Sequence, residues 1–205
     1  MMQSDIDRSQ GKEERSWIYY RFLQMSDLDP LFYHNYRDGG LYLSVIKDDP
    51  LGAKHLFEKG LSIYKEDFWL SYFGAFNDYF ELGNKEDALE KYRAVLSSPL
   101  ASKHSYLYTI IAQLETSTIG HEQSYKTLTS ILTQTTNKHV QKKIKYLLYS
   151  LKAEKDLNCL NGGKKDCSFH DEDGRPYYRD NQGMYRAYKK WRKFESKTTE
   201  TSAEQ

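Results

Sequence analysis

The chain has 205 residues, a length that suits one domain or one repeat array with tails. Its 30 Lys and Arg residues nearly balance its 29 Asp and Glu residues, which argues against a polyelectrolyte tail. A hydrophobic content of 39% excludes a wholly disordered chain, and the lack of any long apolar run excludes a membrane-spanning helix.

The beginning of the chain mixes acids and bases and contains no apolar stretch. We therefore expect residues 1–16 to be a disordered tail rather than a secretory signal or a membrane anchor. This favours a cytoplasmic location. The alternative is a periplasmic or membrane-anchored protein, if the N-terminus is incomplete and an anchor precedes Met1.

The first helical stretches lie between residues 17 and 64. Apolar residues at helical spacing predict one helix over 17–28 and a second over 36–46. Asp49 followed by Pro50 is typical of an N-cap and a first-turn proline, and predicts a third helix. The apolar face of this helix consists of Ala53, Leu56, Phe57, Gly60, Leu61 and Tyr64.

The clearest helix pair lies between residues 69 and 99. Its first helix stops at Gly83, and Asn84 caps the second helix, which ends at 97–99. The first helix carries aromatic residues at helical spacing, namely Trp69, Tyr72, Phe73, Phe76, Tyr79 and Phe80. The inward positions of the second helix are Ala88, Leu89, Tyr92, Val95 and Leu96.

Three further helices are predicted by weaker apolar stripes over 107–114, 125–132 and 140–151, with a break at Gly120 and a cap at Asn137. The chain therefore contains about eight predicted helices joined by short turns. No segment alternates in the manner of a β-strand, so we expect none.

Small residues recur at similar positions of these helices: Ala88 follows Ala53 by 35 residues, and approximately Ser124 follows Ala88 by 36. We call these the marker positions. Between residues 69 and 99, a helix–turn–helix consensus is matched by Tyr72, Ala75, Phe76, Tyr79, Gly83, Ala88, Tyr92, Val95 and Pro99. On these residues the chain resembles a tetratricopeptide repeat protein over 17–155. An irregular helical bundle is the alternative.

The resemblance implies an all-α fold, a right-handed superhelix of antiparallel helix pairs (an α-solenoid) with about three repeats, followed by a C-terminal loop and helix. It also implies a concave groove that holds a peptide or a partner helix. The groove residues carried over from the family are Leu70, Phe73, Asn77 and Phe80, with Tyr42 at an equivalent place.

Asn77 matches a position where some members of that family hold a peptide backbone or a terminal carboxylate. Tyr42 and Leu114 stand where the accompanying Lys and Arg would be, so an aromatic and apolar groove is expected instead. In the alternative interpretation, Phe73 and Phe80 only pack against the neighbouring helix pair.

The C-terminal region breaks the helical pattern. Residues 156–183 are rich in Gly, Asn and Asp, which predicts a loop with turns. Residues 184–195 return to helical spacing and predict a basic aromatic helix that caps the array, and 196–205 read as a disordered tail. Residues 138–197 carry a net charge of +8 against −5 for 1–137. An acidic partner or a solvated helix face accounts for this charge.

No motif for catalysis, nucleotide binding or a cofactor is present, so we expect a protein that is not an enzyme. The spacing of Cys159, Cys167 and His170 lacks the close ligand pair of a structural zinc site, and no metal is expected. Cys159 and Cys167 are a candidate disulfide if the chain is exported, and plain thiols in a reducing cytoplasm.

These observations favour a non-catalytic scaffold or interaction module with a protein or peptide partner. The alternatives are a structural subunit of a bacterial envelope or motility assembly, and a nucleic-acid-binding accessory protein that uses the basic C-terminal helix. Binding of nucleic acid or membrane is disfavoured, because both need exposed aromatic side chains and we expect those of 184–195 to be buried on the array.

Overall fold

The computed structural model describes residues 15–194, and most of them are helical. The chain divides into two compact units, Met1–Lys103 (unit 1) and His104–Gln205 (unit 2). The tails expected over 1–16 and 196–205 lie outside the described residues, except for Arg15 and Ser16. Among the described residues, none of the helices is both long and apolar enough to cross a membrane.

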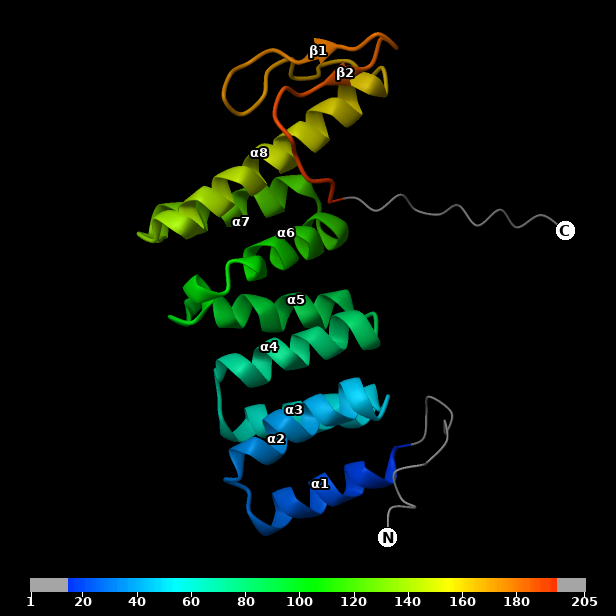
Figure 1. Ribbon diagram of the computed structural model, residues 1–205, viewed down its shortest axis with the longest axis vertical. Helices are drawn as coiled ribbons and strands as arrows, with labels where there is room; N and C mark the ends of the chain where they lie inside the picture. Colours follow the sequence, from blue (N-terminus) through cyan, green and yellow to red (C-terminus); the bar gives the residue numbers. More distant parts are fainter. Residues whose placement is uncertain (1–14, 195–205) are drawn as a thin grey trace, which may run out of the picture. The chain divides into compact units, whose positions relative to one another are not determined.

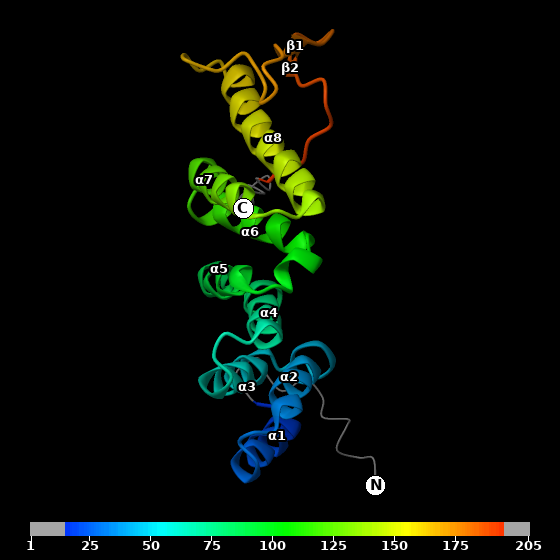
Figure 2. The ribbon, with the colours of Figure 1, turned by 90° about the vertical axis from the view of Figure 1, so that its left-hand side faces the viewer.

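Unit 1 consists of helices joined by short turns. α2 packs against α3, α4 packs against α5, and the two pairs meet where α2 and α3 contact α4 (Figures 1 and 2). α1 contacts α2 and α3. The elements are α1 (Trp17–Leu28), α2 (Tyr33–Leu41), the π-helical η1 (Tyr42–Ile46), α3 (Pro50–Ile63), α4 (Phe68–Phe76), the π-helical η2 (Asn77–Glu81), α5 (Lys85–Ala94), and the 3₁₀ turns η3 (Val95–Ser97) and η4 (Ala101–Lys103).

The helix boundaries of unit 1 follow the capping residues. Oδ1 of Asp49 accepts a hydrogen bond from the backbone N–H of Gly52, and Oδ1 of Asn84 accepts one from the N–H of Asp87. Gly83 adopts a φ of +69°, a conformation open to glycine at little cost. The predicted N-caps at Asp49 and Asn84 are confirmed.

A register of 35 residues relates the two helix pairs of unit 1. α2 begins at Tyr33 and α4 at Phe68, 35 residues later, and η1 and η2 begin at Tyr42 and Asn77 with the same shift. α3 and α5 follow in the same register. The predicted marker residues Ala53 and Ala88 are both completely buried, as a close helix crossing requires.

In unit 2, residues 104–194 form three helices and a short hairpin: α6 (Tyr106–Thr118), α7 (His121–Gln134), α8 (Lys138–Asn161), β1 (Tyr178–Arg179) and β2 (Tyr185–Arg186). α7 packs against both α6 and α8. Ser124 is buried on α7, where its Oγ donates a hydrogen bond to the carbonyl of Ala112 at 3.2 Å. β1 and β2 pair antiparallel, although no strand was predicted.

Two predictions for the C-terminal region are wrong. α8 continues to Asn161, so the turn-rich loop begins about six residues later than 156. Residues 184–194 form no helix, and residue 195 lies outside the described part. β2 is followed by a non-helical segment, residues 187–194, which we name the C-terminal strap. The strap returns along α8 (Figures 1 and 2).

Side chains of α8 explain why this segment is not helical, because they bind the backbone groups that a helix would use internally. Asn161 accepts from the N–H of Tyr185 at 2.7 Å and donates to its carbonyl at 3.1 Å. The N–H of Phe194 donates to both oxygens of the buried Glu154, at 2.9 and 3.0 Å. These hydrogen bonds to α8 outweigh the helical spacing of the aromatic residues in 184–194.

Candidate functional site

The predicted groove residues do not lie on one open surface. Leu70 is buried in the core of unit 1 beside Tyr36 and Phe57. Asn77 is also buried, and its Nδ2 donates to the carbonyl oxygen of Pro50 at 2.9 Å. Its amide joins two elements of unit 1, so neither Leu70 nor Asn77 is available to a partner in this structure. The prediction that these two residues line the groove is wrong.

Phe73 and Phe80 lie on a different face of the same helix, together with two residues that the groove prediction missed. Phe73 is half-buried and stacks on Trp69, with ring centroids 5.5 Å apart. Phe80 is 55% exposed and lies 4.7 Å from the ring of Phe76. We name Trp69, Phe73, Phe76 and Phe80 the aromatic stripe. Their offsets of 0, 4, 7 and 11 residues were the signal that identifies it.

Tyr42 does not join the aromatic stripe. It begins η1 in the preceding helix pair, where its ring meets the edge of Phe22 at 6.1 Å and Nζ of Lys47 lies 5.9 Å from its centroid. Tyr42 is half-buried. Its contacts therefore place it beside α1 rather than beside the rings of α4.

The two π-helical segments expose apolar side chains at equivalent positions. Val45 on η1 is 59% exposed, and Phe80 on η2 stands 35 residues later with a similar exposure. A π-helical turn is rarer and less well packed than an α-helical turn, and it frequently occurs at functional sites. The π-helical turn recurs at the same position of both helix pairs, 35 residues apart, so it is a regular part of the repeated structure in unit 1.

A cluster of charges lies next to η2. Asp78 is completely buried and forms an ion pair with Lys91, while its Oδ1 lies 3.7 Å from Nζ of Lys54. Lys54 also donates to Asp87 at 2.7 Å, and this bond raises the pKa of Lys54 and lowers that of Asp87. Each acid of the cluster thus faces a cation. Such an arrangement holds helices in place and leaves no group poised for proton transfer.

The C-terminal strap and the preceding loop are held to α8 by buried polar groups. Tyr149 donates to Asp171 at 3.1 Å, and Tyr177 donates to Asp156 at the same distance. Burial, followed by the bond to Asp171, raises the pKa of Tyr149 to about 12. These two bonds hold the loop before β1 against α8, next to a pocket.

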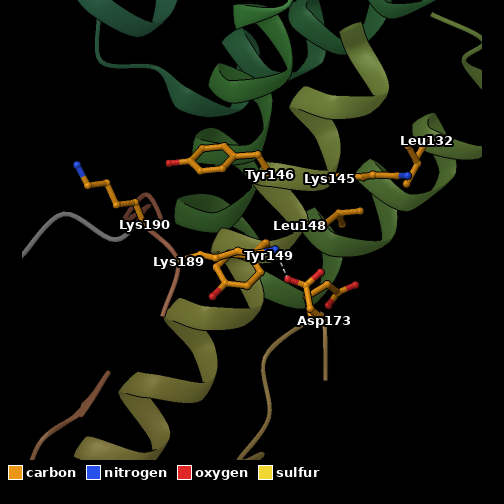
Figure 3. Close-up of a pocket in the computed structure, with 9 residues that line it drawn as sticks. Leu132, Lys145, Tyr146, Leu148, Tyr149, Asp173, Lys189 and Lys190 are labelled. Atoms are coloured by element: carbon orange, nitrogen blue, oxygen red, sulfur yellow. Dashed lines mark hydrogen bonds and ion pairs between the residues drawn. The ribbon is translucent and has the colours of Figure 1, made fainter. Parts of the chain in front are cut away.

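This pocket has a volume of about 560 Å³ and is lined by α7, α8, the loop before β1 and the C-terminal strap (Figure 3). Lys190 and the tip of Tyr146 lie on one side of it, and Lys145 lies beside Leu132 on the other. Lys189 forms an ion pair with Asp173 and lies 5.5 Å from the ring centroid of Tyr149. The remaining lining residues are Leu148 and Glu172.

Within residues 15–194, no three His, Cys, Asp or Glu side chains gather in a way that would hold a metal ion. Cys159 and Cys167 form a disulfide that closes the end of α8 onto the loop after it. Three histidines form side-chain hydrogen bonds: His34 with Asp38, His55 with Tyr19, and His121 with Glu154.

Comparison of the chain with family models, with curated proteins and with solved structures finds no match. The interpretation of the two surfaces consequently depends on their geometry alone.

Proposed function

We propose that the chain is a non-catalytic protein-binding module, in which the aromatic stripe of unit 1 receives an apolar segment of a partner, either an extended peptide or a helix. The helix pairs of such a module stack in the manner of tetratricopeptide repeats. The 35-residue register of helices, π segments and caps in unit 1 supports this arrangement.

The observation that carries the proposal is the exposure of Phe80 at the end of a row of aromatic rings. A phenylalanine that is 55% exposed gains little from folding of its own chain, whereas burial under a partner removes its remaining apolar surface from water. Aromatic residues that stand in a cluster at a surface are the typical anchors of protein interfaces. Val45, at the equivalent position of the other π segment, extends the same kind of surface.

The test uses the full chain with Phe80→Glu, which places a charge on the stripe without touching the core. Ile63→Glu is the matched control, because Ile63 is an exposed apolar residue of unit 1 on α3 and is not one of the four residues of the stripe. Each protein is immobilised and exposed to native lysate, and the captured protein is then purified and titrated against each variant. Circular dichroism verifies that both variants retain their helicity.

The proposal requires that the wild type and Ile63→Glu bind the same purified partner with equal affinity. Phe80→Glu should bind it at least about thirtyfold more weakly, which corresponds to the loss of about 2 kcal/mol that marks a hot-spot residue. Binding should also change the fluorescence of Trp69, whose ring lies in the stripe. Equal binding by Phe80→Glu and the wild type would exclude the aromatic stripe as the binding surface.

A further inference from the structure

Unit 2 has a strongly basic surface. Residues 104–194 contain 16 Lys and Arg residues and nine Asp and Glu residues, a net charge of +7. Four of these nine acids are buried, namely Glu115, Glu154, Asp156 and Asp171. The surface of unit 2 is therefore more basic than its sequence, and a polyanion is attracted to it.

Two cations at the pocket of Figure 3 remain uncompensated. Lys189 is paired with Asp173, and Glu172 accepts a hydrogen bond from Tyr125 at 2.6 Å. Within the described part of the chain, neither Lys145 nor Lys190 forms an ion pair, and both side chains are exposed. The acids that line the pocket are thus already occupied, and these two lysines are left to bind an anion.

One exposed tyrosine, Tyr146, lines the pocket, and a second, Tyr188, stands two residues before Lys190 in the strap. Tyr146 on α8 is 40% exposed, with Nζ of Lys143 6.0 Å from its ring centroid. Tyr188 precedes Lys189 on the strap and is 62% exposed, and its ring lies 4.7 Å from that of Tyr178. The sequence disfavours nucleic acid because the aromatic side chains of 184–195 are expected to be buried, and for Tyr188 this expectation is wrong.

We infer that unit 2 binds single-stranded nucleic acid along this face, with Lys145 and Lys190 on the phosphates and Tyr146 and Tyr188 as stacking platforms for bases. A basic channel combined with exposed aromatic rings is the arrangement by which proteins hold single strands without reading their sequence. This function goes beyond the polypeptide binding proposed for unit 1 and depends on none of its residues.

The tyrosines favour nucleic acid over an acidic polypeptide as the ligand. An acidic peptide would use the lysines alone, because carboxylates gain nothing from the face of a tyrosine ring. Every nucleic acid base, in contrast, has a face that stacks on an aromatic side chain. The contribution of the tyrosines to binding therefore distinguishes the two ligands.

The experiment measures the fluorescence anisotropy of a labelled oligothymidylate of about 16 nucleotides with the full chain, over a range of salt from about 50 to 200 mM. The lysine variant is Lys145→Ala with Lys190→Ala. Its matched control is Lys65→Ala with Lys85→Ala, which removes two exposed lysines of unit 1. The tyrosine variant is Tyr188→Ala, and its control is Tyr20→Ala, an exposed tyrosine of α1.

We expect the lysine variant to reduce the slope of log K against log salt by about 1.4, because two phosphate contacts are lost. Tyr188→Ala should weaken binding at least about fivefold and leave the slope unchanged, since stacking releases no counterions. Both controls should bind as the wild type does. Polyglutamate of similar length should compete poorly.

Three results would overturn the inference: no binding of the oligonucleotide by the wild type at low salt, equal weakening by the unit 1 controls, or full binding by Tyr188→Ala together with effective competition by polyglutamate. The last result would assign the surface to acidic polypeptides. None of these outcomes bears on the Phe80 experiment, because the variants of the two tests lie in different units.

Discussion

Asp49 performs two tasks, and the equivalent residue in the next helix pair performs only one of them. Oδ1 of Asp49 caps α3, while its Oδ2 accepts hydrogen bonds from the backbone N–H and the Oγ of Ser16, both at 2.8 Å. Asn84, 35 residues later, caps α5 in the same way. Its Nδ2 bonds only to Asp87 within its own helix turn. Comparing variants at the two positions therefore distinguishes the contribution of an N-cap to the free energy of unfolding from the contribution of the bonds that hold α1 in place.

The expected costs follow from this difference. Asn84→Ala should lower the free energy of unfolding by about 1 kcal/mol, the usual value of an N-cap. Asp49→Ala should lower it by about 3 kcal/mol, of which about 1 belongs to the cap and about 2 to the charge-assisted bonds to Ser16. Asp49→Asn keeps an acceptor for the cap but turns an NH₂ group or a weaker acceptor toward Ser16, and should fall between these values.

The assay is urea unfolding followed by tryptophan fluorescence. Trp17 and Trp69 belong to unit 1 and Trp191 to unit 2, so a Trp191→Phe background confines the signal to unit 1. If Asp49→Ala costs no more than Asn84→Ala in this background, the bonds to Ser16 contribute nothing, and the reasoning that α1 is held by this carboxylate is refuted.

Two further predictions concern unit 1. A Cβ at Gly40 would overlap the ring of Phe57, whereas a Cβ at Gly74 would meet nothing closer than 3.5 Å. Urea unfolding should therefore show that Gly40→Ala lowers the free energy of unfolding by about 1–3 kcal/mol, and that Gly74→Ala leaves it unchanged or raises it by up to about 1 kcal/mol. The bond from Lys54 lowers the pKa of Asp87 from its ordinary value of 3.8. The ion pair therefore stabilises the fold fully above pH 3.8, and this stabilisation is lost as the pH falls through the lowered pKa of Asp87. Asp87→Asn should accordingly cost less than about 1 kcal/mol near pH 7, because the pair is partly exposed. In unfolding curves at decreasing pH, the difference from the wild type should shrink as the pH falls through the lowered pKa of Asp87.

The sequence predicted the parts of the fold that depend on local signals. The caps at Asp49 and Asn84 and the stop at Gly83 each act through the backbone of the next few residues, and all three stand where the sequence placed them. The small residues Ala53 and Ala88 are buried because their helices cross there.

The parts that depend on distant contacts were not predictable in this way. The aromatic spacing of residues 184–194 is helical, but Glu154 and Asn161 on α8 bind the backbone of this segment and hold it non-helical. The π-helical turn of η2 could likewise not be predicted, because the apolar spacing that indicates a helix does not distinguish a π-helical turn from an α-helical one. In the structure Asn77, at the start of η2, is buried, and the residues that share a face with Phe73 are Trp69 and Phe76. The groove was therefore assigned to the wrong residues of this helix.

At one pair of equivalent positions in the 35-residue register, the first helix pair has two apolar residues and the second has two charged residues. Leu43 and Leu56 are buried together in the core of the first helix pair. The residues that stand 35 positions later are Asp78 and Lys91, which form an ion pair in the second. The first pair thus demonstrates that this position accepts two leucines in the same backbone.

Replacing the ion pair by the leucines of the first helix pair tests what the charges contribute. Asp78→Leu with Lys91→Leu should leave the stability of unit 1 unchanged or raise it by about 1–4 kcal/mol, because a buried ion pair loses most of its attraction to desolvation. Asp78→Leu alone should cost about 3–5 kcal/mol, since Lys91 then lacks its buried partner, while Lys54 keeps its bond to Asp87. If the double variant is the more stable protein but loses the capture seen with the wild type, the charges serve to hold η2, and with it Phe80, in the conformation that binds. If the double variant is less stable than Asp78→Leu alone, the two helix pairs are not equivalent at this position, and the comparison between them fails.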